Sequence, residues 1–250
     1  MCLIAWNWQP ASATSLLLLA NRDEFYHRAA SPLHWWEGGQ LLAGQDLQAG
    51  GTWLGVSRSG RLAALTNYRQ PTPASTGTPS RGELVANFLD SETGAAQFLH
   101  TLASRANAYN PFNLLVFDGV QLMGLESRHA RVLEMPTGVG AVSNADFQTP
   151  WPKVTQLKKG LQSCLDQHRT NADHLMALLQ DPTQPPDALL PHTGIPLPLE
   201  RALSAAFIAT PHYGTRASSL VRLHRSHAEF FENSYDAGGL ICQNHHTFPL

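Results

Sequence analysis

The sequence has no apolar run long enough to cross a bilayer. The longest, Leu16 to Ala20, is far shorter than the roughly 20 residues that a membrane-spanning helix needs. No basic segment followed by an apolar stretch opens the chain, as a signal peptide would. We therefore expect a cytoplasmic protein without a membrane span.

Charge is also scarce. Only 14% of the residues are charged, the formal net charge is −2, and Lys and Arg form no cluster. These values exclude the basic surface typical of proteins that bind nucleic acid or anionic membranes. We expect partners that are small and largely uncharged molecules, and the sequence makes no prediction about the oligomeric state.

The chain lacks the cysteine and histidine spacings of disulfide frameworks and metal sites. Its three cysteines, Cys2, Cys164 and Cys242, include no Cys-x-x-Cys pair, so neither disulfides nor a zinc site are predicted. The twelve histidines include no His-Glu-x-x-His motif, and we expect them on the surface rather than around a metal. Cys164 lies beside Leu161 and Leu165 in an expected helix, which predicts a small core residue.

Hydrophobic residues make up 43% of the chain, enough for a buried core, and we expect one domain over residues 1–250. Asp118-Gly119 predicts a hairpin turn, Asn171 a helix cap, and Ser80-Arg-Gly-Glu83 a capping box. The expected strands span residues 2–8, 15–20, 52–57, 61–67, 112–117, 120–125, 131–135, 140–143, 216–223 and 228–233. The expected helices span residues 80–89, 94–105, 152–168 and 171–179, with irregular stretches at 70–79 and 181–199.

Strands and helices come in separate groups along the chain rather than alternating singly. This order argues against a doubly wound parallel sheet. The residues from Leu16 to Leu19 are all apolar, which suits a strand covered on both faces. We therefore predict an α+β fold in which two antiparallel sheets face each other and helices cover their outer sides.

Cys2 is the first candidate for chemistry. If the initiator Met1 is removed, Cys2 carries both a thiol and the free α-amino group. Both groups titrate near neutrality, with reference pKa values of about 8.5 and 7.7–8.0, so the amine is able to act as the base for the thiol. The alternative is a small buried residue on the first strand.

Polar residues near the ends of other expected strands are further candidates. Asn67 and Asn144 each have an amide that can donate to the oxyanion of acyl transfer, although asparagine is also common in turns. Arg22 and Asp23 follow the second expected strand, where they either balance the charges of Cys2 or form a solvated cluster. Because neighbouring strand residues point to opposite faces, both can face Cys2 only if the strand twists there.

Six separated motifs relate the chain to a known family. They are Cys2, Asn21-Arg22-Asp23-Glu24, Gly50-Gly-Thr-Trp53, Thr66-Asn-Tyr-Arg69, Val142-Ser-Asn144 and Tyr213-Gly-Thr-Arg216. With these motifs, residues 2 to about 235 resemble the transport-and-Golgi-organisation (NRDE) family. Gly50 and Gly51 of the third motif either allow backbone to approach a ligand closely or form a bulge.

The resemblance implies an N-terminal-nucleophile (Ntn) hydrolase fold, a four-layer αββα sandwich. The chain is also similar, more remotely, to the cysteine amidases of this fold that cleave bile-salt and penicillin amides. That similarity implies Cys2 as the nucleophile, Arg22 and Asp23 beside it, Asn67 and Asn144 near the oxyanion, and Arg216 as a further charge. Arg22 and Asp23 are adjacent here, whereas the amidases separate the equivalent pair by two residues.

Two functions follow from the resemblance. The first is a hydrolase that cleaves a linear amide bond of a small acyl substrate through Cys2, with Trp53 and Tyr68 in contact with the substrate. The second is a non-catalytic carrier, because members of the family are implicated in haem mobilisation and in lipid or acyl-CoA metabolism. We expect no resident cofactor or metal, and haem only as a transported ligand.

Overall fold

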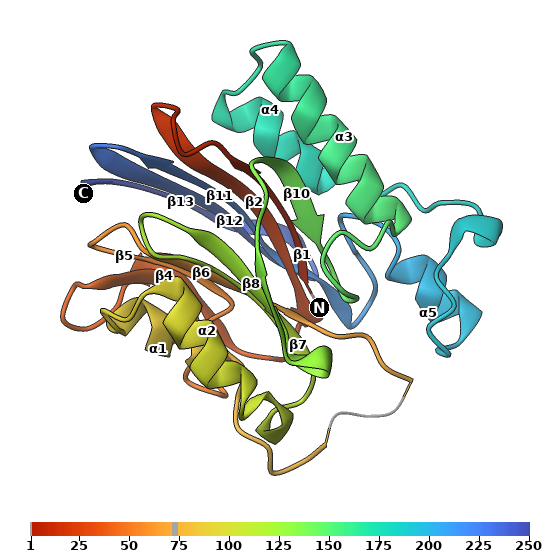
Figure 1. The fold of residues 1–250 in the computed structure, drawn as a ribbon. Coiled ribbons are helices and arrows are strands. Elements are labelled where there is room, and N and C mark those ends of the chain that lie inside the picture. Colours follow the sequence, from red (N-terminus) through yellow and green to blue (C-terminus); the bar gives the residue numbers. More distant parts are fainter. Residues whose placement is uncertain (1, 72–74) are drawn as a thin grey trace.

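In the computed structural model, which describes residues 2–71 and 75–250, two antiparallel sheets face each other with helices outside them (Figure 1). The first has six strands in the order β10-β1-β2-β11-β12-β13. Its strands are β1 (Cys2–Trp8), β2 (Thr14–Phe25), β10 (Gly138–Val142), β11 (Tyr213–His224), β12 (His227–Asp236) and β13 (Gly239–Pro249).

The second sheet has seven strands in sequence order, from β3 to β9. They are β3 (Ala30–Trp35), β4 (Leu41–Asp46), β5 (Leu54–Ser57), β6 (Leu62–Asn67), β7 (Phe112–Phe117), β8 (Leu122–Glu126) and β9 (Arg131–Glu134). Every strand pairs with its neighbour in the chain, so this sheet is a continuous meander.

Helices cover the outer faces of both sheets (Figure 1). On the seven-stranded sheet lie α1 (Gly82–Asp90) and α2 (Ala95–Ala103), and on the six-stranded sheet lie α3 (Pro152–Asp166) and α4 (Ala172–Ala177). The remaining helical segments are α5 (Leu197–Ala202) and the short 3₁₀ turns at Ala106–Ala108, Ser127–His129, Leu178–Gln180 and Asp187–Leu189. This arrangement confirms the predicted αββα sandwich.

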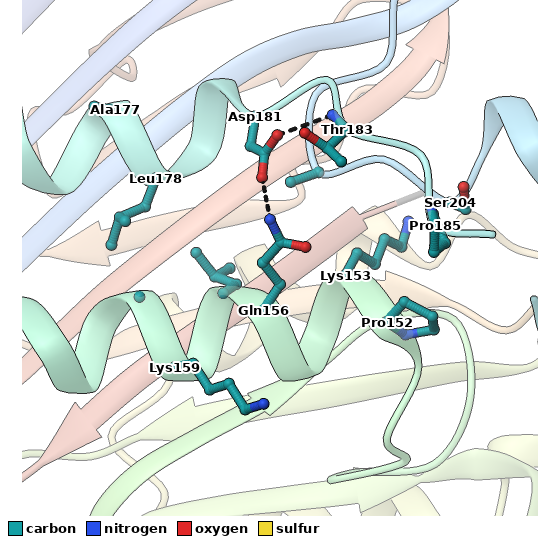
Figure 2. A pocket seen from close by; sticks show the side chains of 13 residues that line it. Pro152, Lys153, Gln156, Lys159, Ala177, Leu178, Asp181, Thr183, Pro185 and Ser204 are labelled. Carbon is teal, nitrogen blue, oxygen red and sulfur yellow. Dashed lines mark hydrogen bonds between the residues drawn. The ribbon is translucent and has the colours of Figure 1, made fainter. Parts of the chain in front are cut away.

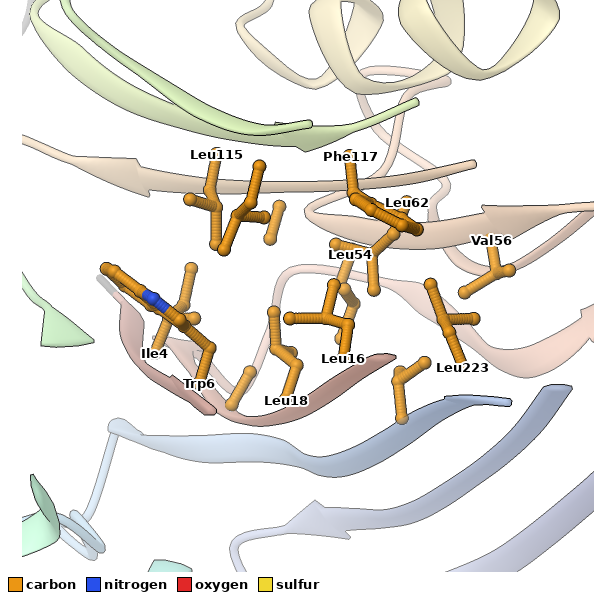
Figure 3. Close-up of a cluster of buried hydrophobic side chains, with 14 of the residues drawn as sticks. Ile4, Trp6, Leu16, Leu18, Leu54, Val56, Leu62, Leu115, Phe117 and Leu223 are labelled. Atoms are coloured by element: carbon orange, nitrogen blue, oxygen red, sulfur yellow. The ribbon is translucent and has the colours of Figure 1, made fainter. Parts of the chain in front are cut away.

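Alternation along β1 and β2 builds two separate cores. Ile4 and Trp6 point toward the other sheet. The alternate residues Leu3 and Ala5 point the opposite way and pack against α3 and α4. Figure 3 shows the layer between the sheets, in which Trp6 and Leu18 meet residues such as Leu115 of β7. Burial of each leucine side chain stabilises the fold by about 1.5–3 kcal/mol. Because both faces of β1 and β2 are buried, this free energy fixes the register of the two strands and hence the direction of Cys2.

Most of the expected elements are present, with three differences in the strands. The second strand, expected to end at Ala20, continues to Phe25, so Arg22 and Asp23 lie within it rather than after it. The strand expected at 140–143 is β10, which follows β9 in the chain but pairs with β1 in the six-stranded sheet. Strands β3, β4 and β13 were not predicted.

The four expected helices form within a few residues of their predicted bounds, but the capping box at Ser80 is wrong. Helix α1 begins at Gly82 with no side-chain cap. The hydroxyl of Ser80 accepts from Gly82 N at 3.3 Å, and Glu83 instead accepts from Tyr109 Oη at 2.6 Å. Asn171 does cap α4, since its Oδ1 accepts from His174 N at 2.9 Å.

Two predicted features are partly or wholly outside the described residues. The polar loop expected at 70–79 contains residues 72–74, and the start of the chain contains Met1; neither is described. Over residues 2–71 and 75–250, no helix is both long and apolar enough to cross a membrane.

Candidate active site

A polar cavity opens where β1 begins. It has a volume of about 540 Å³ and is lined by both sheets, by the segment after β4 and by the start of α1. Its lining includes five residues to which the sequence assigns a role: Cys2, Arg22, Asp23, Trp53 and Asn67. The fold therefore gathers around Cys2 residues that are far apart in the sequence.

Cys2 is the first residue of β1 and points between the sheets. It pairs directly with Arg22 on β2, so both side chains lie on the face that also carries Ile4. Cys2 is 7% exposed, and this burial raises the pKa of its thiol. The Asp23 carboxylate raises that pKa further, whereas Arg22 lowers it. The thiol therefore keeps its proton at neutral pH, and nucleophilic attack requires a base.

Arg22 is held by Asp46, at the end of β4, and by Trp53, just before β5. Its Nη2 donates to Asp46 Oδ2 at 3.1 Å, and its guanidinium carbon lies 4.5 Å from the ring centre of Trp53. Asp46 also accepts from Arg28 Nε at 2.6 Å. Burial alone would raise the pKa of Asp46, but Arg28 and Arg22 bring it below its usual value. The resulting bridge fixes the position of Arg22 beside Cys2.

Asp23 points to the opposite face of β2, as strand alternation requires, yet it also lines the cavity. Thr215 Oγ1 donates to Asp23 Oδ1 at 2.8 Å, and Tyr213 Oη donates to its backbone carbonyl at 2.9 Å. Burial raises the pKa of this carboxyl, and the ammonium group of Lys153 counteracts that rise. Cys2 thus has a guanidinium on its own face and a carboxylate held from the helix side.

Asn67 and Asn144 occupy different positions. Asn67 ends β6 and lines the Cys2 cavity, and its side-chain amide makes no hydrogen bond to the described residues. Asn144 is fully buried, and its Nδ2 donates to the backbone carbonyl of Asn67 at 2.8 Å. Because Asn144 does not line the Cys2 cavity and donates to the backbone of Asn67, its geometry fits a residue that positions Asn67 rather than one that contacts an oxyanion.

Arg216 and Tyr68 do not line the Cys2 cavity. Nη1 of Arg216 donates to the carbonyls of Phe25, Tyr26 and Arg28 at 3.0–3.1 Å, next to a register shift in β11. Tyr68 donates to Asp146 Oδ1 at 3.3 Å and lines a separate hollow. Arg216 is therefore placed to hold the turn that follows β2, and Tyr68 lies away from Cys2.

The glycine motif before Trp53 allows close approach of two backbones. A Cβ atom at Gly51 would lie 2.4 Å from the carbonyl carbon of Gly82, which is closer than real Cβ atoms come. Thr52 N donates to Gly82 O at 3.2 Å in the same contact. This contact joins two backbone segments of the chain and brings the start of α1 to the cavity wall, while approach of this backbone to a ligand stays a prediction.

No group of three or more His, Cys, Asp or Glu side chains is arranged to hold a metal ion in the described part of the chain. Cys2, Cys164 and Cys242 are all free thiols. Cys164 is partly buried against the core under α3, as expected for a small packing residue.

Comparison with known proteins decides the family. A family model described as Transport and Golgi organisation 2 matches residues 1–237. The chain belongs to this family. A Transport and Golgi organization protein 2 homolog of Bos taurus is 34% identical and covers 94% of this chain and 93% of its own length. The Homo sapiens homolog is 31% identical with the same coverage.

Solved structures share the fold of this Transport and Golgi organisation 2 family member. A Cys2→Ala mutant of conjugated bile acid hydrolase from Clostridium perfringens aligns with a TM-score of 0.56 at 8% identity, covering 100% of this chain and 92% of that one. The Caenorhabditis elegans ortholog of N-acylethanolamine-hydrolyzing acid amidase aligns with a TM-score of 0.50 at 9% identity, covering 88% and 92%. At these identities the likeness shows an Ntn-hydrolase-like fold and nothing further.

Sequence reasoning missed several charged residues of this site. Arg28, Asp46 and Arg81 all line the cavity, but none is next to a motif that suggests chemistry. Lys153 had a usable signal: it lies four residues before Leu157 and eight before Leu161, on the buried stripe of α3. A lysine on such a stripe indicates a buried charge.

Lys153 lies behind Asp23, at the wall of a second cavity. This cavity, of about 460 Å³, separates α3 from residues 177–185 and also contacts Ser204 (Figure 2). Lys153 is 4% exposed, and its Nζ has no hydrogen-bond partner among the described residues. Asp23, Arg69, Cys2 and Glu200 are the charged or titratable groups around it. A buried ammonium without a hydrogen bond is costly.

We expect Lys153→Met to flatten the pH dependence of stability. Burial lowers the pKa of Lys153 from 10.5 to about 8, although Asp23 opposes this. The unfolded chain then holds the proton more readily between those pH values, so the unfolding free energy of the wild type rises as the pH increases through this interval. Without Lys153 that rise, at most about 3 kcal/mol, is lost. Urea unfolding at neutral and at alkaline pH measures it.

Lys159→Met is the matched control, because Lys159 lies on the same helix but is exposed. It removes the same charge and should keep the wild-type slope. Equal slopes for the wild type and Lys153→Met would contradict the prediction.

Proposed function

We propose that the protein is a cysteine hydrolase that cleaves a linear amide bond of a small acyl substrate. The observation that carries the proposal is that the Cys2 thiol and the unbonded amide of Asn67 line one cavity, from opposite sheets. A nucleophile and a neutral hydrogen-bond donor around one space are what acyl transfer needs. The shared Ntn-hydrolase-like fold is consistent with this chemistry.

The proposed reaction starts after removal of Met1, which gives Cys2 a free α-amino group. The amine accepts the thiol proton as Sγ attacks the substrate carbonyl carbon, and Asn67 Nδ2 donates to the resulting oxyanion. When the C–N bond breaks, the ammonium returns a proton to the leaving amine and Cys2 holds the acyl group as a thioester. Water then attacks the thioester, releases the acid and restores the thiol.

The neighbouring charges suit these steps. Because burial raises the pKa of the Cys2 thiol, the reaction depends on transfer of the thiol proton to the α-amino group as the sulfur attacks. Arg22 lies on the same face and stabilises the sulfur as negative charge develops on it. Asp23 is positioned by Thr215 and lies close enough to the start of β1 to raise the pKa of Cys2, and in this reaction it orients the α-ammonium group.

Intact-mass analysis tests the proposal directly. We expect active protein to have lost Met1, because only then is the Cys2 amine free to act as the base. A screen of acyl amides, with mass analysis of the N-terminal peptide, should also detect a Cys2 thioester. Active protein that retains Met1 would rule out this reaction, since the Cys2 nitrogen would then be part of a peptide bond.

A second candidate function is a carrier that binds haem or an acyl lipid in the same cavity without cleaving it. The observation that favours it is the raised pKa of the Cys2 thiol, because a protonated thiol is a poor nucleophile. A spectral titration with haem tests one form of this carrier, and the absence of a Soret shift at micromolar protein would exclude haem as the ligand.

A further inference from the structure

Among the residues that the structure describes, Arg81 has no carboxylate partner although it lies in a charged site. It is partly buried at the start of α1 and lines the Cys2 cavity. Nη1 donates to the carbonyl of Pro111 at 3.1 Å, and its other nitrogens make no hydrogen bond to the described residues. Burial disfavours an unpaired guanidinium and lowers the pKa of Arg81. A ligand that supplies negative charge would remove this penalty.

The carboxylates around Arg81 are engaged elsewhere. Asp46 binds both Arg22 and Arg28, and the oxygens of Glu24 lie next to Phe25 N at 2.9 Å and Arg28 Nε at 4.0 Å. Glu83, the nearest acidic residue along the chain, accepts from Tyr109 Oη at 2.6 Å. The chain itself therefore provides no ion pair for Arg81 within the described residues.

The position of Arg81 relates it to the nucleophile. Arg81 and Cys2 line the same cavity, as do Glu24 and Arg28. Cys2, Glu24 and Arg28 are the charged or titratable groups that act on the guanidinium of Arg81. The close contact between Gly51 and Gly82 fixes this end of α1 against the loop that precedes Trp53. An anion bound to Arg81 would thus be held at a defined place beside Cys2.

We propose that Arg81 binds a carboxylate of the ligand in the Cys2 cavity, so that the preferred ligands are organic acids rather than neutral molecules. Arginine is the side chain best suited to this role, because its planar donors match the two oxygens of a carboxylate. The identity of the substrate rests on the proposed hydrolase function: it is an amide that carries a carboxylate near the scissile bond. This differs from the largely uncharged partner that the net charge predicts.

Alkylation of Cys2 tests the proposal without any substrate turnover. Iodoacetate carries a carboxylate and iodoacetamide is its neutral counterpart, so the ratio of their rates at Cys2, followed by mass analysis of the N-terminal peptide, reports binding of the anion. We expect Arg81→Gln to lower this ratio about tenfold, the effect of losing one charge-assisted contact. The iodoacetamide rate should stay within about twofold of the wild type.

Two controls separate anion binding from other effects. Arg105→Gln removes the same charge at an exposed position outside the cavity lining and should keep the wild-type ratio. Arg81→Lys keeps the positive charge and should restore part of the ratio that Arg81→Gln loses. An unchanged ratio in Arg81→Gln, or an equal change in both rates, would overturn the proposal. The second result would mean that Arg81 acts on the thiol itself.

Protection of the wild-type protein gives a test that needs no variant. Butyrate should slow the reaction of Cys2 with iodoacetamide, whereas butyramide should not. Equal protection by both compounds, or protection by inorganic phosphate and not by butyrate, would overturn the assignment to a carboxylate. Because the thiol reacts whether or not the protein turns over an amide, failure of the hydrolase proposal would leave this result unaffected.

Discussion

Cys2→Ala is expected to abolish amide hydrolysis, by a factor of at least about 10³, while leaving ligand binding intact. The thiol is the atom that attacks the substrate, and loss of a nucleophile typically removes nearly all of the rate enhancement. Cys2 is a small residue at the start of β1, so alanine fills most of its space and the cavity should keep its shape. Turnover of an acyl amide and binding of the same compound by calorimetry measure the two effects.

Cys164→Ala is the matched control, because Cys164 lies on α3 outside the cavity lining. This variant should hydrolyse the amide at the wild-type rate. Substantial turnover in Cys2→Ala would show that another group is the nucleophile. If the wild type and Cys2→Ala bind the ligand equally and neither cleaves it, the carrier function is the correct one.

Asn67→Ala is expected to lower kcat by about 10²–10³, which corresponds to roughly 3–4 kcal/mol of transition-state stabilisation. Asn67 lines the Cys2 cavity from the other sheet, and its side-chain amide makes no hydrogen bond to the described residues. It is therefore available to donate to the oxyanion, a bond that is strongest in the transition state. KM should change little, and steady-state kinetics separates the two constants.

Asn67→Asp tests the same point with a side chain of the same shape that accepts but does not donate, and it should be as slow as Asn67→Ala. Asn87→Ala, an exposed change on α1, should behave like the wild type. An effect confined to KM would show that Asn67 binds the ground state rather than the oxyanion.

Local signals were sufficient for the strands and helices with a clear apolar period. β1 has the expected bounds because buried residues lie on both of its faces. β13 was missed because it lies at the edge of the sheet and carries polar residues such as Gln243 and His245. Phe248 is its one buried residue, so the strand shows no regular apolar alternation. β3 contains Pro32 and pairs with β4 through a register shift, so its sequence does not show a regular strand.

The site was only partly predictable, for a different reason. Cys2 and Asn67 occur in motifs, and their types alone suggest acyl transfer. Arg81, Asp46 and Lys153 gain their roles from contacts between segments far apart in the chain, such as the bridge from Arg22 to Asp46. No local pattern encodes such contacts. The length of β2 was also not predicted. Because the strand continues to Phe25, Arg22 and Asp23 lie within it and point to opposite faces.

The place of β2 between β1 and β11 has a consequence for biosynthesis. On the ribosome, β1 and β2 emerge first and can form a hairpin at once. The partner on the other side of β2 begins only at Tyr213, so one edge of an apolar strand stays unpaired through most of translation. A nascent or stalled chain therefore exposes a surface prone to aggregation, and Thr215, which holds Asp23, joins the site only after β11 has been made.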